Sequence, residues 1–341
     1  MSVGHFVSVV CPVYQERAHI AACLDALLAQ TYPSERIEFL LVDGGSTDGT
    51  RDVVRGYVAK DNRIRLLENP HRTVPYALNI GIRASRGDTI VRVDAHSTYP
   101  DDYVLRLVNE LYRLKADNVG GVWKTLPGDT TAQAYAVAYV TSSAIGVGNS
   151  AHKTGELHIQ QVDTVPYGCF PRALFDRIGY FDEEMTRNQD DELNGRITQA
   201  GGKIYIIPDV EIGYRARPTI AKMAKMYYQY GLFKPLGNSK LKRPTTWRQF
   251  VPMLFVEGLV VGSILSAFIP FFWGFYLCVL GLYLLVLLVD AMRYALRTCK
   301  FKAAILIPYA YASLHFSYGT GYWVGLCKLL TGGSFDVNIS R

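Results

Sequence analysis

The sequence predicts an α/β domain built on a Rossmann-like, mostly parallel sheet, followed by a C-terminal region of transmembrane helices. Two observations predict this architecture: strand-like and helix-like segments alternate through the first part of the 341-residue chain, and long uncharged stretches fill its last part. Regular alternation is typical of a sheet with helices on both faces. We therefore expect a large first domain at 1–214 and a basic amphipathic interfacial segment at 215–248. A hydrophobic region with two or three transmembrane helices should follow at 249–330, and a tail at 331–341.

The expected strands are short runs rich in β-branched residues, at 6–13, 37–43, 64–69 and 88–94. Each precedes a segment with helical spacing of apolar residues, at 20–30, 50–60, 74–85 and 101–114. Ligands of such sheets bind beyond the carboxyl ends of the strands. Asp43 ends the second expected strand and Asp94 the fourth, so both carboxylates should reach one edge of the sheet.

The hydrophobic region is long enough to cross a membrane. No charged residue stands between Glu257 and Asp290, a stretch that exceeds the roughly 20 residues one crossing needs. Pro270 near its middle predicts a hairpin of two helices, at 251–269 and 271–289. The alternative, a pair of buried core helices, is disfavoured by the length of the uncharged stretches.

A basic loop follows the second expected crossing. Arg293, Arg297, Lys300 and Lys302 cluster there, which favours a cytoplasmic position for this loop. The next uncharged run, at 303–327, contains a histidine and several glycines. Its pattern leaves a third crossing, a re-entrant segment or an interfacial helix open.

Composition excludes several classes of protein. The formal charge is only +6 and no basic run is interleaved with aromatic residues, so a nucleic-acid partner is not expected. The six cysteines form no CxxC pair, which disfavours a zinc site or a disulfide framework. The chain also lacks GxGxxG after its first strand and GxxxxGK[ST] anywhere. A divalent cation on Asp94, with His96 as ligand or orienting partner, could instead hold a diphosphate; alone, each could be a turn or surface residue.

Five motifs together resemble the inverting family 2 glycosyltransferases with the A-type nucleotide-sugar fold. They are VSVVCPVYQE, LLVDGGSTDGT, RASRGDTIVRVDAH, VDTVPYGCFPRALFDRIGYFDE and NQDDELNGRITQAGGKIYIIPD, in this order. The chain is most similar to the membrane-attached, succinoglycan glucosyltransferase-like branch of that family. The resemblance implies a hexosyltransferase that uses a nucleotide-sugar donor, a UDP-sugar, and a divalent cation, manganese or magnesium.

The resemblance assigns roles to residues at the nucleotide end. Pro12, Tyr14 and Glu16 match the family's first-strand turn and Asp43 its second-strand acid, which together hold base and ribose. Asn79 matches a position near the nucleotide, although a structural hydrogen-bonding role is an equal alternative.

At the reaction centre the resemblance makes Asp94 a metal ligand, with His96 where many relatives carry a second aspartate. A nitrogen ligand suits manganese better than magnesium. Asp190 matches the family's general base, which takes the proton of the acceptor hydroxyl. Asp191 follows directly, so the base assignment could shift by one residue, and acids at a helix start also stabilise the helix dipole. Gly168 resembles an acceptor-side turn where a missing side chain admits the sugar, and the resemblance places Asp191 on the acceptor side as well.

The resemblance and the membrane pattern together predict transfer of one sugar, with glucose as one candidate, to a polyprenyl-diphosphate-linked saccharide in exopolysaccharide or surface glycan assembly. The segment YQYGLFK lacks the QxxRW motif of processive relatives. The expected location is a bacterial inner membrane with the catalytic domain cytoplasmic. Three alternatives stay open: a polyprenyl-phosphate glycosyltransferase, a non-catalytic sugar-nucleotide-binding membrane partner, and a transporter-like protein.

Overall fold

A computed structural model describes residues 4–148, 150–155 and 158–335. The chain divides into two compact units. The first, here the sheet unit, comprises Met1–Lys124 and Ala151–Tyr214; the second, the helical unit, comprises Thr125–Ser150 and Arg215–Arg341. One boundary between the two units falls after residue 214, and residues 125–150 group with the helical unit, which the sequence pattern did not indicate.

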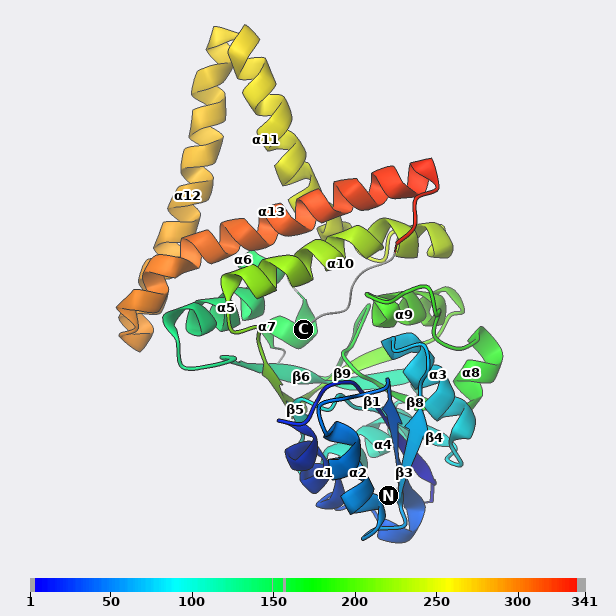
Figure 1. The fold of residues 1–341 in the computed structure, drawn as a ribbon. Helices are drawn as coiled ribbons and strands as arrows, with labels where there is room; N and C mark the ends of the chain where they lie inside the picture. Colours follow the sequence, from blue (N-terminus) through cyan, green and yellow to red (C-terminus); the bar gives the residue numbers. More distant parts are fainter. Residues whose placement is uncertain (1–3, 149, 156–157, 336–341) are drawn as a thin grey trace. The chain divides into compact units, whose positions relative to one another are not determined.

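One mixed sheet forms the centre of the sheet unit (Figure 1). Its order is β3-β2-β1-β4-β8-β6-β9-β5, and β7 pairs with β9. The strands have these bounds: β1 Val7–Val13, β2 Ile37–Asp43, β3 Ile64–Glu68, β4 Thr89–Arg92, β5 Ser97–Thr98, β6 Asn118–Leu126, β7 Gln160–Gln161, β8 Cys169–Pro171 and β9 Ile204–Arg215.

The first four strands are parallel, as the alternation predicted. Strand β8 is antiparallel to both β4 and β6, and β5 and β7 are antiparallel to β9. This antiparallel half was not predicted, because β5, β7 and β8 are only two or three residues long and carry no periodic signal.

Helices cover both faces of the sheet. One apolar core joins alternate residues of β1 to buried side chains of α1 (Ile20–Leu28), α2 (Thr50–Val58) and α4 (Tyr103–Arg113). The other core contains Val10 of β1 and side chains of α3 (Val74–Ala84), α8 (Ala173–Ile178) and α9 (Gln189–Gln199). Successive strand residues point to opposite faces, so one buried strand supplies both cores. The predicted doubly covered sheet is confirmed.

The helical unit consists of α5 (Ala132–Ser142), α6 (Ala144–Val147), α10 (Ile220–Leu241), α11 (Phe250–Phe268), α12 (Pro270–Thr298) and α13 (Phe301–Thr331); α7 (Ala151–Thr154) belongs to the sheet unit. The hairpin predicted at Pro270 is present, with Ile269 alone between α11 and α12. Residues 247–268 and α12 are long and apolar enough to span a membrane, and only 17% and 6% of their apolar windows are buried. A core helix would be mostly buried, so that alternative fails.

Helix α10 carries the basic segment and packs lengthwise on α13 (Figure 1). A side-chain carbon on Gly231 of α10 would collide with the carbonyl of Tyr318, and one on Gly321 of α13 with that of Tyr228. This close approach buries most apolar residues of α10, including Met223. These apolar residues therefore pack inside the protein, and the interfacial position expected for this segment stays a prediction.

Candidate active site

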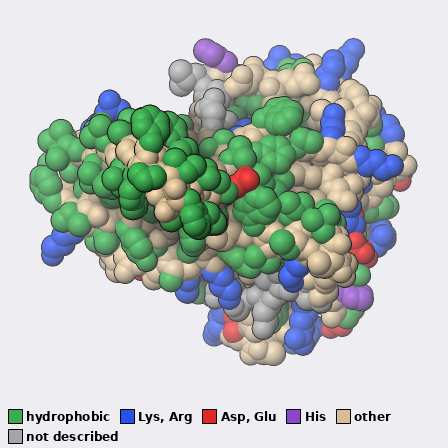
Figure 2. All heavy atoms as spheres, turned by 90° about the horizontal axis from the view of Figure 1, so that it is seen from above, with side chains coloured by type: hydrophobic (Ala, Val, Ile, Leu, Met, Phe, Trp, Pro, Cys, Tyr) green, Lys and Arg blue, Asp and Glu red, His purple; other side chains and the backbone are tan. Residues whose placement is uncertain are grey.

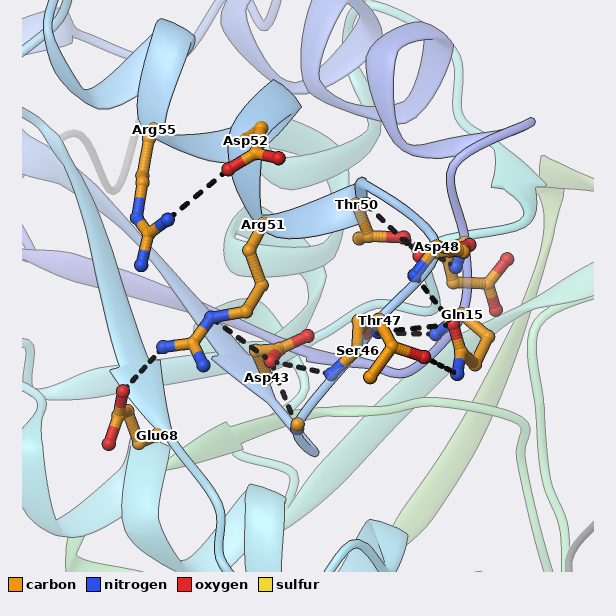
Figure 3. Close-up of polar contacts among 12 residues, drawn as sticks. Gln15, Asp43, Ser46, Thr47, Asp48, Thr50, Arg51, Asp52, Arg55 and Glu68 are labelled. Atoms are coloured by element: carbon orange, nitrogen blue, oxygen red, sulfur yellow. Dashed lines mark hydrogen bonds and ion pairs between the residues drawn. The ribbon is translucent and has the colours of Figure 1, made fainter.

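Asp43 stands at the carboxyl end of β2 and anchors the loop that follows it. Its Oδ2 atom accepts hydrogen bonds from the backbone N–H groups of Gly45 (2.9 Å) and Ser46 (3.0 Å), as Figure 3 shows. Arg51 lies on the same side, with Nε 3.6 Å from Oδ2. The Asp43 Oδ1 atom is buried and has no hydrogen-bond partner among the described residues. A buried acceptor in this state is suited to an N–H or O–H group of a ligand.

Hydrogen bonds join the turn after β1 to the loop that follows β2. Backbone N–H of Gln15 donates to the Ser46 hydroxyl (2.9 Å), and the Gln15 side chain binds Thr47 (3.0 Å) (Figure 3). Tyr14 packs against Gly44, where a side-chain carbon would lie 3.3 Å from the tyrosine ring and 3.3 Å from the Arg72 backbone. Pro12 and Tyr14 thus lie at the edge of the sheet where Asp43 ends β2, since Val13 pairs with Asp43.

Asp94 lies two residues beyond the end of β4, at the same edge of the sheet. Its backbone N–H donates to the Tyr99 hydroxyl (2.7 Å), which donates in turn to the Asp94 carbonyl (3.1 Å). The Asp94 side chain remains 22% exposed. The tyrosine therefore fixes the backbone and leaves the carboxylate accessible.

His96 and Glu16 meet beside Asp94. The histidine Nδ1 lies 3.4 Å from Glu16 Oε1, and Glu16 is 2% exposed. The sequence placed Glu16 with the nucleotide, whereas the structure brings it to the histidine as well. An accessible carboxylate with a carboxylate-oriented imidazole nearby is a donor set that fits a divalent cation, provided that diphosphate and water oxygens complete it. Among the described residues, no group of three or more histidine, cysteine and acidic side chains is arranged to hold a metal alone.

Asp190 lies in the first turn of α9 and makes an ion pair with Arg92, the last residue of β4. The Arg92 side chain is 5% exposed, and its other nitrogen lies 3.4 Å from Asp94 Oδ1. Burial raises the pKa of Asp190 to about 6, although the Arg92 guanidinium lowers it. The structure therefore joins the predicted metal ligand and the predicted base through one buried cation.

Arg92 is a residue that the sequence reasoning missed. Its guanidinium also stacks over the ring of Tyr167 at 5.6 Å. The available signal was an arginine inside the apolar run IVRVD, because a charge in a buried strand needs a partner.

Asp191 differs from its neighbour in its contacts. Its Oδ1 atom accepts a hydrogen bond from the Thr164 hydroxyl at 3.1 Å. Thr164 in turn accepts from Asn194 of α9 (2.8 Å), so Asp191 belongs to a polar network of its own helix. This arrangement favours Asp190 over Asp191 as the base.

Asn79 and Gly168, two of the predicted site residues, make contacts that support the fold. Asn79 donates to the Phe181 carbonyl and Glu183 carboxylate, both at 2.9 Å, and accepts from Phe181 N–H at 3.0 Å. These bonds use both of its donor hydrogens, which favours the structural alternative for Asn79. Gly168 has φ +94°, and the space of its missing side chain is filled by the Phe170 ring and the Asn118 side chain. The glycine therefore serves the turn and the packing, and the approach of a sugar at this position stays a prediction.

The sequence profile of glycosyl transferase family 2 matches residues 8–179, which carry β1 to β8 and the Asp43 and Asp94 positions. The chain belongs to glycosyl transferase family 2. Its relatives in this family include the succinoglycan biosynthesis protein ExoA of Rhizobium meliloti (strain 1021), 31% identical over 260 residues, or 76% of this chain and 77% of ExoA.

A second family 2 relative comes from Methanococcus voltae and is 26% identical over 95% of this chain and 98% of its own length. Its name is dolichyl N-acetyl-alpha-D-glucosaminyl phosphate 3-beta-D-2,3-diacetamido-2,3-dideoxy-beta-D-glucuronosyltransferase. Among solved structures, the mannosyltransferase PcManGT of Pyrobaculum calidifontis, in complex with GDP-Man and Mn2+, superposes with a TM-score of 0.59. It is 19% identical and covers 92% of this chain, which covers 87% of it. The sheet unit thus has the A-type glycosyltransferase fold.

Proposed function

We propose that this family 2 glycosyltransferase transfers one sugar, with inversion, from a nucleotide-diphosphate sugar to a polyprenyl-linked saccharide at the cytoplasmic surface of a bacterial inner membrane. The observation that carries the proposal is the Asp94–Arg92–Asp190 arrangement at the strand edge that also holds Asp43. It places a candidate phosphate-side carboxylate and a candidate base on either side of one fixed cation. Glycan assembly is also the process named for the relative ExoA.

The donor would bind along the ends of β1, β2 and β4. The unpaired Oδ1 of Asp43 would accept from the base or the ribose, with Pro12 and Tyr14 beside it. Asp94, oriented by Tyr99, and His96 would hold a divalent cation, which would neutralise the diphosphate. We propose a UDP-sugar as the donor.

The acceptor hydroxyl would lose its proton to Asp190. Arg92 keeps this carboxylate ionised and fixes its direction, because its guanidinium is itself held by Asp94 and by the Tyr167 ring. The activated acceptor oxygen would then attack the anomeric carbon from the side opposite the diphosphate. The new C–O bond would form as the bond to the diphosphate breaks and the nucleoside diphosphate leaves, so the configuration would invert.

The membrane hairpin supports a lipid-linked acceptor. An enzyme with two candidate membrane helices meets substrates at the bilayer surface, where a polyprenyl-linked sugar presents its hydroxyl groups. Exposed lysines of α10, such as Lys222, could pair with its phosphates. The Methanococcus voltae relative is named for an acceptor on dolichyl phosphate, so a monophosphate link is as suitable as the diphosphate link that we favour.

The test is to incubate purified full-length protein with a panel of nucleotide sugars and four acceptors, and to identify products by mass. The acceptors are a polyprenyl diphosphate saccharide, a polyprenyl monophosphate saccharide, polyprenyl phosphate alone and a free oligosaccharide. We expect one sugar to be added to a lipid-linked saccharide, and excess chelator and Asp94→Ala to abolish transfer. Asp191→Asn is the matched acidic control.

The outcomes separate the candidates. A product on polyprenyl phosphate alone would replace the proposal by a polyprenyl-phosphate glycosyltransferase. Equal rates on free and lipid-linked saccharides would contradict the proposal that the acceptor is lipid-linked. Binding of nucleotide sugars without any turnover would indicate a non-catalytic membrane partner.

A further inference from the structure

Helix α13 presents an apolar face that the start of α11 covers only in part, at Gly319 and Trp323. The side chains on this face are exposed by between 37% and 78%: Phe301, Ile305, Tyr309, Phe316, Val324 and Leu330. At 100° per residue they fall within one side of the helix. Between Lys302 and Lys328 the helix has no acidic, lysine or arginine residue. Figure 2 views the molecule from the side of the hairpin and shows many hydrophobic side chains at the surface on this side.

The opposite face of α13 is fixed to the protein by glycines. A side-chain carbon on Gly321 or Gly325 would collide with the backbone carbonyl of Tyr228 or Leu232 of α10. Contacts this close hold α13 lengthwise on α10, so the helix cannot turn its apolar face inward. Its 31 residues span about 46 Å.

The contacts of α13 with the hairpin define its direction. Near its middle, the Tyr311 hydroxyl donates to Asp290 Oδ2 (2.8 Å), directly after the uncharged part of α12. Further along, the Trp323 indole N–H donates to the carbonyl of Met253 (3.3 Å), in the first turn of α11. Both contacts lie at the open end of the hairpin, away from its tip at Ile269. If the hairpin spans a bilayer, both points lie at the same surface, and α13 runs along that surface.

Cations surround the elbow where α12 becomes α13. Arg293, Arg297, Lys300 and Lys302 are exposed, and none has a carboxylate within ion-pair distance in the described part of the chain. Lys300 lies over the Tyr135 ring at 3.3 Å, which fixes one cation at the elbow. Basic side chains beside an apolar helix face complement anionic phosphate groups.

We propose that α13 is an in-plane membrane helix rather than a third crossing, with its apolar face at the acyl boundary of an anionic phospholipid bilayer and the elbow cations on the headgroup phosphates. The inference rests on the proposed membrane attachment of the hairpin. The exposed part of the α13 face continues from the hairpin, and the cations beside it complement anionic headgroups. A phospholipid bilayer is therefore the occupant that we propose for this face.

Two exposed positions at the ends of α13 carry the test: Cys299 at the elbow and Ser334 just beyond the helix. Full-length protein with Cys278→Ser, Cys327→Ser and Ser334→Cys is placed in sealed vesicles of phosphatidylglycerol and phosphatidylcholine in one orientation and treated from each side with a membrane-impermeant thiol reagent. We expect both thiols to be modified from the same side only. A third crossing would place them at the two ends of a helix about 46 Å long, on opposite sides of the bilayer, and would overturn the proposal.

Depth is measured with spin labels on Cys substitutions in a background without the exposed cysteines. Labels at Ile305, Tyr309 and Phe316 should all lie at one shallow depth, about 5–10 Å below the headgroups. A steady increase in depth along α13, or water access to all three labels, would contradict the in-plane helix. A label on Cys278 is the control: if it also stays in water, the hairpin is not in the membrane and the attachment itself fails.

Discussion

At the scale of single residues, Asp190 has the titration behaviour that a general base needs near neutral pH. Burial raises its pKa to about 6, so the carboxylate is ionised at pH 7 and protonated as the pH falls through 6. A base is active only when ionised. We therefore expect kcat/KM, which reports groups of the free enzyme, to fall about tenfold per pH unit below 6.

The Asp190→Asn variant should bind nucleotide sugar normally and lose on the order of a hundredfold or more in transfer rate. Asp191→Asn is the matched control. It should keep the transfer rate and the fall of kcat/KM at acidic pH, because the Asp191 carboxylate of the native protein is engaged by the Thr164 hydroxyl. Isothermal titration and product assays across pH 4.5–8 would measure this. If Asp191→Asn is the damaging change, the assignment of the base is wrong by one residue.

Arg92 should act as a positioning residue between two carboxylates. Removing its charge in Arg92→Gln leaves Asp190 and Asp94 close together without a counterion, which disfavours ionisation of both. We expect the acidic limb of kcat/KM to move upward by about one pH unit, equivalent to about 1.4 kcal/mol. Arg92→Lys keeps the charge and should restore part of the shift.

The exposed Arg83 on α3 offers a matched control. Its guanidinium lies 3.9 Å from the Glu183 carboxylate and makes no ion pair with Asp94 or Asp190 among the described residues. Arg83→Gln should leave the pH profile unchanged. A profile unmoved by Arg92→Gln, with only a uniform loss of stability, would show that Arg92 merely supports the fold.

At the scale of helices and strands, glycines decide how α10 and α13 associate. In Gly321→Ala and Gly325→Ala the added carbon meets the backbone carbonyls of Tyr228 and Leu232, which cannot move without separating the helices. Overpacking of this kind costs about 1–3 kcal/mol. We expect both variants to unfold at a lower temperature in detergent, as followed by circular dichroism.

Gly281 of α12 is the control for this substitution, because nothing lies within 4 Å of the carbon it would gain. Gly281→Ala should be neutral or slightly stabilising, since alanine is favoured over glycine inside a helix by up to about 1 kcal/mol. Equal melting temperatures for all three variants would mean that the α10–α13 approach is looser than described.

At the scale of the whole molecule, the chain combines a family 2 sheet unit with a helical unit that carries an apolar hairpin long enough to span a membrane. The division is not sequential. Residues 125–150 lie in the middle of the chain but belong to the same unit as the C-terminal helices. Within this unit the Tyr139 hydroxyl of α5 donates a hydrogen bond to the Asp290 carboxylate of α12 (3.0 Å). The helical unit is thus tied together by polar bonds at the base of the hairpin.

Local sequence patterns were enough to predict the parallel half of the sheet, the end of β2 at Asp43, the family and the hairpin at Pro270; the strand expected to end at Asp94 ends two residues earlier, at Arg92. These features depend on local signals: β-branched runs, helical spacing, turn chemistry and length of uncharged stretches. They are encoded by residues close together in the chain, so they can be recognised without a structure.

Only the tertiary structure decided which side chains meet across the chain. It brought Arg92 between Asp94 and Asp190, about a hundred positions away, showed that Asn79 is engaged by Phe181, and laid α13 against α10. The physical reason is that pairing of a buried charge and collision of glycine backbones are properties of contacts between distant segments. Periodicity and composition describe each segment alone and contain no information about its partner.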